Sequence, residues 1–304
     1  MRQIILLLLL TLGLWAKAIT PNEVYAQAML ISEETHILLK YYGIKHDHEG
    51  IIKRYTHKIA LKPRNVWQMT YEIALKINIL RTAHNLPIIE PVNMTPVLNL
   101  NPDLVYEQTQ RILTEIKIFK YRVGIKNEEL KVKKYKNKTP LDVFNLLNRI
   151  TASFDELNRA AFTPSYVFGE TMRVYEDLNT ILRYLKIKDT TIPDKRNVKA
   201  TPSDSFEVAM NVLNKINKLQ HSVGIDIVDF SVFRKKNIKP RDVFTITQMI
   251  IAELQTIKAY IGLKDYITPA ATTYINKSPA DVEQLMTWNL RKISLIDISA
   301  MRLQ

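Results

Sequence analysis

The sequence predicts an all-α fold: an eight-helix repeat protein made of two tandem four-helix units, arranged as a helix bundle or a short helical array. Three observations predict it. A six-residue motif, cap-Pro-x-acid-Val-aromatic with x any residue, recurs along the chain. Glycines follow several copies of it at a constant distance. Only 7 of the 304 residues are glycine. Low glycine content argues against turn-rich β folds and favours helices.

The repeated motif is typical of a helix start. Its prolines are residues 21, 63, 102, 140, 164, 202, 240 and 279. In six of the eight copies the preceding residue is Thr, Ser or Asn, whose side chain accepts a hydrogen bond from a free N–H group of the first turn. Proline suits the first helical position because its φ is fixed and its missing N–H is not needed there. In the copy that begins at Thr139-Pro140, Asp142 completes a capping box.

The core positions and the helix ends repeat with the same regularity. Apolar residues recur 3, 10, 14, 17 and 21 positions after the proline, which places them on one face of a helix. Gly43, Gly124, Gly224 and Gly262 all lie 22 positions after a proline, and a hydrophobic residue follows each of them. Glycine followed by a hydrophobic residue is typical of a Schellman helix ending. Each full helix is therefore predicted to span about 22 residues and to be about 33 Å long.

The spacing of the prolines predicts an internal duplication. Successive spacings are 42, 39, 38, 24, 38, 38 and 39 residues, which is symmetric about the short one. We expect a first four-helix unit over 19–161 and a second over 162–304, and the sequence leaves open whether the two form one continuous domain. The short joint predicts that the fourth and fifth helices pack as an antiparallel hairpin. The other linkers reach about 50 Å when extended, so the sequence does not fix the direction of the helices that they join.

Residues 1–18 have the pattern of a cleaved secretory (Sec) signal peptide. Arg2 precedes an apolar run from Ile4 to Trp15, and Ala16-Lys17-Ala18 fits the small-x-small cleavage rule. The alternative is an uncleaved anchor, but the run is shorter than the roughly 20 residues that span a bilayer. The sequence has no cysteine, hence no lipobox and no disulfide. We therefore expect a periplasmic or secreted protein.

The formal net charge of +13 directs attention to basic linkers and to cations at helix starts. The candidate anion- or partner-binding residues are Lys133, Lys134, Lys136, Arg234, Lys235, Lys236, Arg241 and Arg64. Outside the cytoplasm, the expected partner is an envelope protein or an anionic lipid or polysaccharide, with peripheral membrane contact left open and no nucleic acid expected. The alternative is that these charges only keep exposed linkers soluble.

His46 and His48 form a weak candidate for a transition-metal site, because imidazole is a common ligand of such ions. Their spacing specifies little, and a solvated linker is the alternative, so no metal and no cofactor is predicted. The sequence contains no Gly-rich phosphate loop and no Ser-His-Asp order, so no enzyme is predicted.

The sequence therefore favours a non-enzymatic exported scaffold or adaptor that binds another cell-envelope component through a basic face. The alternative is a carrier or sensor that holds an anionic or apolar small ligand, or a lipid, between its helices. Small residues seven positions after the prolines would leave room for such a cavity.

Overall fold

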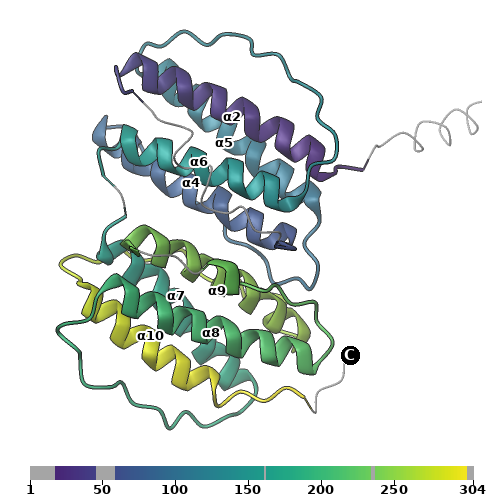
Figure 1. The fold of residues 1–304 in the computed structure, drawn as a ribbon, viewed down its shortest axis with the longest axis vertical. Helices are drawn as coiled ribbons and strands as arrows, with labels where there is room; N and C mark the ends of the chain where they lie inside the picture. The colour runs from purple at the N-terminus through teal and green to yellow at the C-terminus, as the bar shows by residue number, and fades with distance from the viewer. Residues whose placement is uncertain (1–17, 46–58, 161, 234–236, 300–304) are drawn as a thin grey trace, which may run out of the picture.

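The computed structural model describes residues 18–45, 59–160, 162–233 and 237–299, which form eight α-helices, a short 3-10 helix and no strand (Figure 1). The all-α prediction is confirmed. The elements are α2 (Pro21–Tyr41), α4 (Pro63–Ala83), α5 (Pro102–Arg122), α6 (Pro140–Leu157), α7 (Pro164–Tyr184), α8 (Pro202–Ser222), η1 (Ser231–Phe233), α9 (Pro240–Tyr260) and α10 (Pro279–Ile293).

Every α-helix in the described part of the chain begins at one of the repeated prolines, as predicted. In six of these helices, the side chain of the third helical residue accepts a hydrogen bond from the backbone N–H of the cap residue. The Asp142 carboxylate accepts from the Thr139 N–H at 2.8 Å. Lys62 has no side-chain acceptor, yet its N–H still donates to the Asn65 side chain at 2.9 Å. These bonds satisfy N–H groups that the helix itself leaves free.

The helix ends are also confirmed. Gly43, Gly124, Gly224 and Gly262 all have positive φ, and each stands directly after a cap residue. After Gly124, the N–H of Ile125 donates to the Lys120 carbonyl at 2.8 Å, which is the longer bond of a Schellman ending. Lys186 occupies the same place after α7 with φ of +56°.

The eight helices pack as two bundles of four (Figure 1). The first bundle contains α2, α4, α5 and α6, and the second contains α7, α8, α9 and α10. In both bundles the first and second helices in the chain each pack against the third and the fourth. The two bundles therefore share one arrangement of helices.

All four helices of a bundle run in the same direction. Pro21, Pro63, Pro102 and Pro140, with the valines three positions later, enclose one hollow of about 20 Å³. The four prolines of the second bundle meet around a hollow of about 10 Å³. The linkers that the structure describes throughout, at residues 84–101, 123–139, 185–201 and 261–278, therefore run back along their bundles before the next helix begins (Figure 1). Parallel packing gathers four positive helix ends, and acids in the first turn, such as Glu23 and Asp142, offset them.

The predicted hairpin between the fourth and fifth helices is wrong. Helices α6 and α7 run in opposite directions, but they are not packed side by side. Instead α4 packs against α9, and this contact joins the two bundles. The physical reason is that α6 already buries its apolar face against α2 and α4, while α7 buries its own against α9 and α10.

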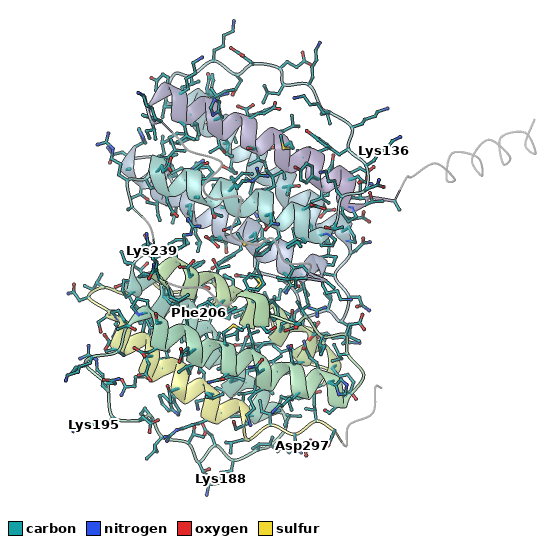
Figure 2. The ribbon with its side chains drawn as sticks, in the orientation of Figure 1. Lys136, Lys188, Lys195, Phe206, Lys239 and Asp297 are labelled. Atoms are coloured by element: carbon teal, nitrogen blue, oxygen red, sulfur yellow. The ribbon has the colours of Figure 1, made fainter. Side chains whose placement is uncertain are left out.

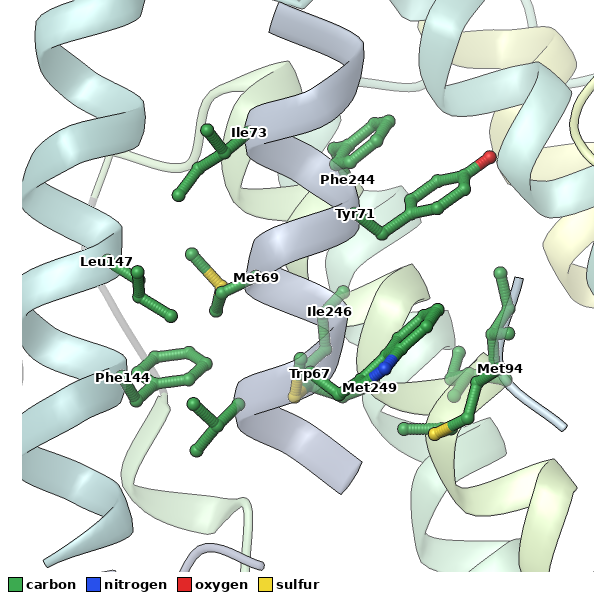
Figure 3. Close-up of a cluster of buried hydrophobic side chains, with 14 of the residues drawn as sticks. Trp67, Met69, Tyr71, Ile73, Met94, Phe144, Leu147, Phe244, Ile246 and Met249 are labelled. Atoms are coloured by element: carbon green, nitrogen blue, oxygen red, sulfur yellow. The ribbon is translucent and has the colours of Figure 1, made fainter. Parts of the chain in front are cut away.

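Helix α4 is apolar on two sides because it packs in both directions (Figure 3). Met69 and Ile73 point toward α6, where Phe144 lies, and all three are buried. Trp67 and Tyr71 point the other way, toward the second bundle, where the Tyr71 hydroxyl donates to Glu170 of α7, and both are also buried. This double burial makes α4 the centre of the molecule.

Polar contacts recur at equivalent positions of the two bundles. The buried ion pair of Glu34 with Lys120 (2.5 Å) has its counterpart in Asp177 with Lys258 (3.0 Å). Further matched contacts are Arg81–Glu115 with Gln220–Glu253, Asn78–Ile89 with Asn217–Val228, and Lys138–Tyr25 with Lys277–Phe168. A residue of one bundle can therefore be compared directly with its counterpart in the other.

Candidate functional site

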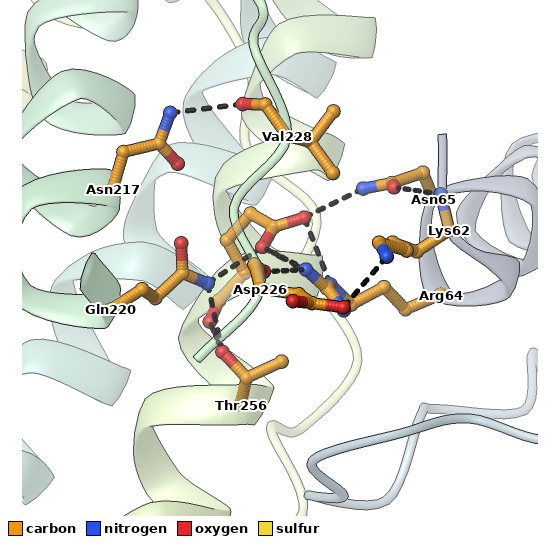
Figure 4. Close-up of polar contacts among 9 residues, drawn as sticks. Lys62, Arg64, Asn65, Asn217, Gln220, Asp226, Val228 and Thr256 are labelled. Carbon is orange, nitrogen blue, oxygen red and sulfur yellow. Dashed lines mark hydrogen bonds and ion pairs between the residues drawn. The ribbon is translucent and has the colours of Figure 1, made fainter. Parts of the chain in front are cut away.

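Arg64, one of the predicted partner-binding cations, lies inside the molecule (Figure 4). It is 2% exposed, and its Nε donates to both carboxylate oxygens of Glu253 on α9, at 3.0 and 3.1 Å. Asn65 donates to the same carboxylate at 2.8 Å, and Gln220 does so at 2.7 Å. Arg64 therefore takes part in joining the two bundles.

Arg241 has a similar place at the other end of the contact between α4 and α9. Its Nη1 lies 3.1 Å from the Asp155 carboxylate of α6. Burial by itself lowers the pKa of Arg241, but the carboxylates of Asp155 and Glu72 outweigh burial and raise that pKa. Both predicted arginines are thus ion-paired within the protein.

Lys133, Lys134 and Lys136 are exposed in the linker 123–139, between α5 and α6. Lys133 lies 3.5 Å from Glu33. Figure 2 shows Lys136 beside the first bundle, whereas Lys195 lies at the far end of the second bundle. Among the described basic linkers, the one with Lys136 and the one with Lys195 therefore lie at opposite ends of the molecule.

The remaining predicted site residues lie outside the described residues. These are Arg234, Lys235, Lys236, His46 and His48. Within the described ranges, no group of three or more His, Cys, Asp or Glu side chains is placed to hold a metal ion. None of the helices that the structure describes is long and apolar enough to cross a membrane.

The candidate site is an open groove of about 750 Å³ between α8 and α10, which we call the α8–α10 groove. Its apolar lining is Ile192, Leu290 and Leu295. Its polar lining is Thr190, Thr191, Asn211, Asn214, Lys215, Lys218, Arg291 and Ser294. None of the residues that line it is acidic.

The wall opposite α8 is part of the linker 185–201, which α10 holds in place. The Trp288 indole N–H donates to the Thr191 hydroxyl at 2.9 Å, and the Gln284 amide donates to the Asp194 carbonyl at 2.6 Å. Arg291 is ion-paired with the Asp194 carboxylate and donates to the Ile192 carbonyl at 3.3 Å. One wall of the groove is thus a linker fixed by side chains, and the others are helices.

Lys215 and Lys218 give the groove its charge. Both are exposed, and neither makes an ion pair with any described residue. Asn211 and Asn214 likewise have no hydrogen-bond partner for their side chains in the described part of the protein. The groove therefore offers two free cations and two free amides beside an apolar floor.

Sequence reasoning missed these groove residues. One signal was present, because Lys-Ile-Asn occurs at the same offset in α4 and α8, at 76–78 and 215–217. That signal gives the equivalence of Lys76 and Lys215, but not which of the two is covered. Searches against protein-family models, curated proteins and solved structures return no match to this chain.

Proposed function

We propose that the protein is a non-enzymatic, exported helical scaffold or adaptor that binds another component of the cell envelope. The observation that supports this proposal is the α8–α10 groove, which is open at the surface and carries two unpaired lysines. The groove is built on helices of a packed bundle, so its shape is present before a partner arrives. Preorganised surfaces bind with a smaller entropic cost. The N-terminal pattern of residues 1–18 supports export.

The packing of the bundle centres favours this function over a carrier. The small residues seven positions after the prolines, such as Ala28 and Thr171, are fully buried. The hollows at the helix starts measure about 20 and about 10 Å³. A hollow of that size holds about one water molecule and no lipid. Small side chains at these positions thus serve close helix packing.

The buried charges also favour a structural role. Glu34, Asp177 and Glu253 are each fully buried and each lies against a cation from another helix. A carboxylate held in this way stabilises the contact between its helices and has no open side for a substrate. In the α8–α10 groove the unpaired charged groups are Lys215 and Lys218, which suit binding of an anionic partner.

Affinity capture from envelope extracts tests the proposed function. The mature protein, tagged at its C-terminus, is expected to retain one envelope component in stoichiometric amount after washing at about 0.15 M salt. Retention of no component would contradict the adaptor function. Lipid found in stoichiometric amount by mass spectrometry of the purified protein would instead support the carrier.

A further inference from the structure

The first bundle contains a counterpart of the α8–α10 groove, between α4 and α6. Lys76 of α4 corresponds to Lys215, because each lies thirteen residues after its proline. Asp155 of α6 corresponds in the same way to Ser294 of α10. Both grooves lie between the second and the fourth helix of their bundle. The α8–α10 groove is also lined by the linker 185–201, whose counterpart in the first bundle runs through residues 46–58, outside the described residues.

In the first bundle this groove is filled by a segment of the chain itself. Phe162, from the linker 158–163, is 2% exposed, and its ring lies 4.7 Å from the Lys76 ammonium. The same ring stacks on Phe244 of α9 with centroids 3.9 Å apart. Asn158, at the start of the linker, donates to the Lys76 carbonyl at 3.1 Å. The start of α9 covers the same place, because Arg241 pairs with Asp155 at 3.1 Å and the Thr245 hydroxyl donates to Glu72 at 3.4 Å. In the first bundle this groove is therefore covered by other segments of the chain, which contribute the aromatic side chains Phe162 and Phe244.

The filled groove supplies its own carboxylates. The Lys76 ammonium lies 2.5 Å from Asp155 and 3.4 Å from Glu72, so its charge is neutralised by its own bundle. In the α8–α10 groove, the counterparts of these two acids are Ser294 and Asn211. Lys215 therefore has no carboxylate at either of the two positions that neutralise Lys76 in the first bundle.

The open groove has also gained positive charge. Ile79 of α4 corresponds to Lys218, and Ala152 of α6 corresponds to Arg291. Compared with the first bundle, two neutral positions are cationic and two acidic positions are neutral, and of the two added cations only Lys218 is unpaired, because Arg291 pairs with Asp194. An occupant that neutralises Lys215 and Lys218 must therefore bring its own carboxylates.

We propose that the α8–α10 groove binds a short acidic peptide segment of a partner protein. One aromatic or large apolar side chain of the segment packs on Leu290 and Leu295, and its carboxylates pair with Lys215 and Lys218. A peptide is favoured over a lipid headgroup because segments of protein, Phe162 and the start of α9, cover the equivalent groove of the first bundle. This inference rests on the proposed function and names the chemistry of the partner.

Peptide display tests this assignment directly. A random peptide library is selected on the wild-type protein at about 0.15 M salt, and the enriched peptides are synthesised for fluorescence anisotropy. They are expected to be rich in Asp and Glu and to contain an aromatic residue. Their affinity should fall about tenfold or more for Lys215→Glu/Lys218→Glu, because two attractive pairs become repulsive.

The matched control is Lys133→Glu/Lys134→Glu, which makes the same change in charge on exposed lysines of the linker 123–139. It should change peptide affinity by less than about twofold, since it alters only long-range charge. Thermal unfolding of both variants should match the wild type because all four lysines are exposed. Anionic vesicles replace the peptide in a parallel series, and a loss that is specific to the groove variant there would favour a membrane surface instead.

Peptides without an excess of acidic residues, or with equal affinity for the groove variant and the wild type, would overturn the assignment. The capture experiment separates this failure from failure of the adaptor function. If wild type and groove variant retain the same partner equally, the adaptor function is supported and binding through the α8–α10 groove is excluded. If the peptides bind through the groove but the protein captures no envelope component, the peptide site is supported and the adaptor function is contradicted.

Discussion

Lys76 and Lys215 occupy the same position in the two bundles, yet only Lys76 is buried, at 1% exposure. Lys76 is held by Asp155 and Glu72 and lies against the Phe162 ring. Lys215 points into an open groove without an ion pair among the described residues. Of these two equivalent lysines, only Lys76 lies near the contact between α4 and α9, and only Lys76 is part of the core.

Replacing Lys76 by Met should destabilise the protein strongly. It leaves Asp155 and Glu72 close together with one cation fewer, and removing one partner of a buried ion pair costs about 3–5 kcal/mol. Urea unfolding measures the effect as a lower midpoint. The matched variant Lys215→Met should change stability by no more than about 0.5 kcal/mol, since that side chain is exposed. Equal losses in the two variants would contradict the assigned burial.

The buried pair of Glu34 and Lys120 should show strong coupling. Lys120→Met alone is expected to cost about 3–5 kcal/mol, because it strands a fully buried carboxylate. Adding Glu34→Leu should recover most of that loss, since two apolar side chains then replace the pair. A double-mutant cycle in urea supplies the measurement. Additive losses would show that the two side chains do not interact.

Stability should depend on pH through the capping acids. Hydrogen bonds from the Thr201 N–H and hydroxyl lower the pKa of Asp204 below its ordinary value. A lowered folded-state pKa contributes stability that is present above the unfolded pKa of about 3.9 and is lost as pH falls below it. Asp204→Ala should therefore cost about 0.5–1 kcal/mol at pH 7 and less at pH 2–3.

Asp204→Asn is the matched control for that experiment, because Asn65 already caps α4 with an amide oxygen. We expect it to retain part of the stability of wild type and to remove the pH dependence of this cap. Chemical unfolding at several pH values tests both variants. A constant difference between wild type and Asp204→Ala from pH 7 to pH 2 would exclude the capping role.

Lys186→Gly should stabilise the protein by about 0.5–1 kcal/mol, because Lys186 has a left-handed conformation that a side chain disfavours. The equivalent residues after α5 and α8 are already glycine. The reverse change, Gly124→Lys, should lower stability by a similar amount, with no steric neighbour within 4 Å of its Cβ. Thermal unfolding of the two variants measures both effects. Shifts of the melting temperature in the same direction would show that the two helices do not end in the same way.

The helix starts could be predicted from the sequence because they depend only on neighbouring residues. Thr139, Pro140 and Asp142 define a helix start wherever the helix packs. The roles of Arg64 and Arg241 were not readable, since their partners Glu253 and Asp155 lie far away in the chain. The same limit applies to the groove, because Lys76 and Lys215 begin the same Lys-Ile-Asn triplet, which does not tell which lysine is covered.

The sequence by itself determined the eight helices, their starts, the four endings at glycine, and the repeat that relates α2, α4, α5 and α6 to α7, α8, α9 and α10. Caps, proline and glycine act within a few residues, so their effect does not require the rest of the fold. Only the tertiary structure decided that the helices of a bundle are parallel, that α4 meets α9, and that one of two equivalent grooves stays open. Long linkers permit either helix direction, and packing of the completed helices selects one of them.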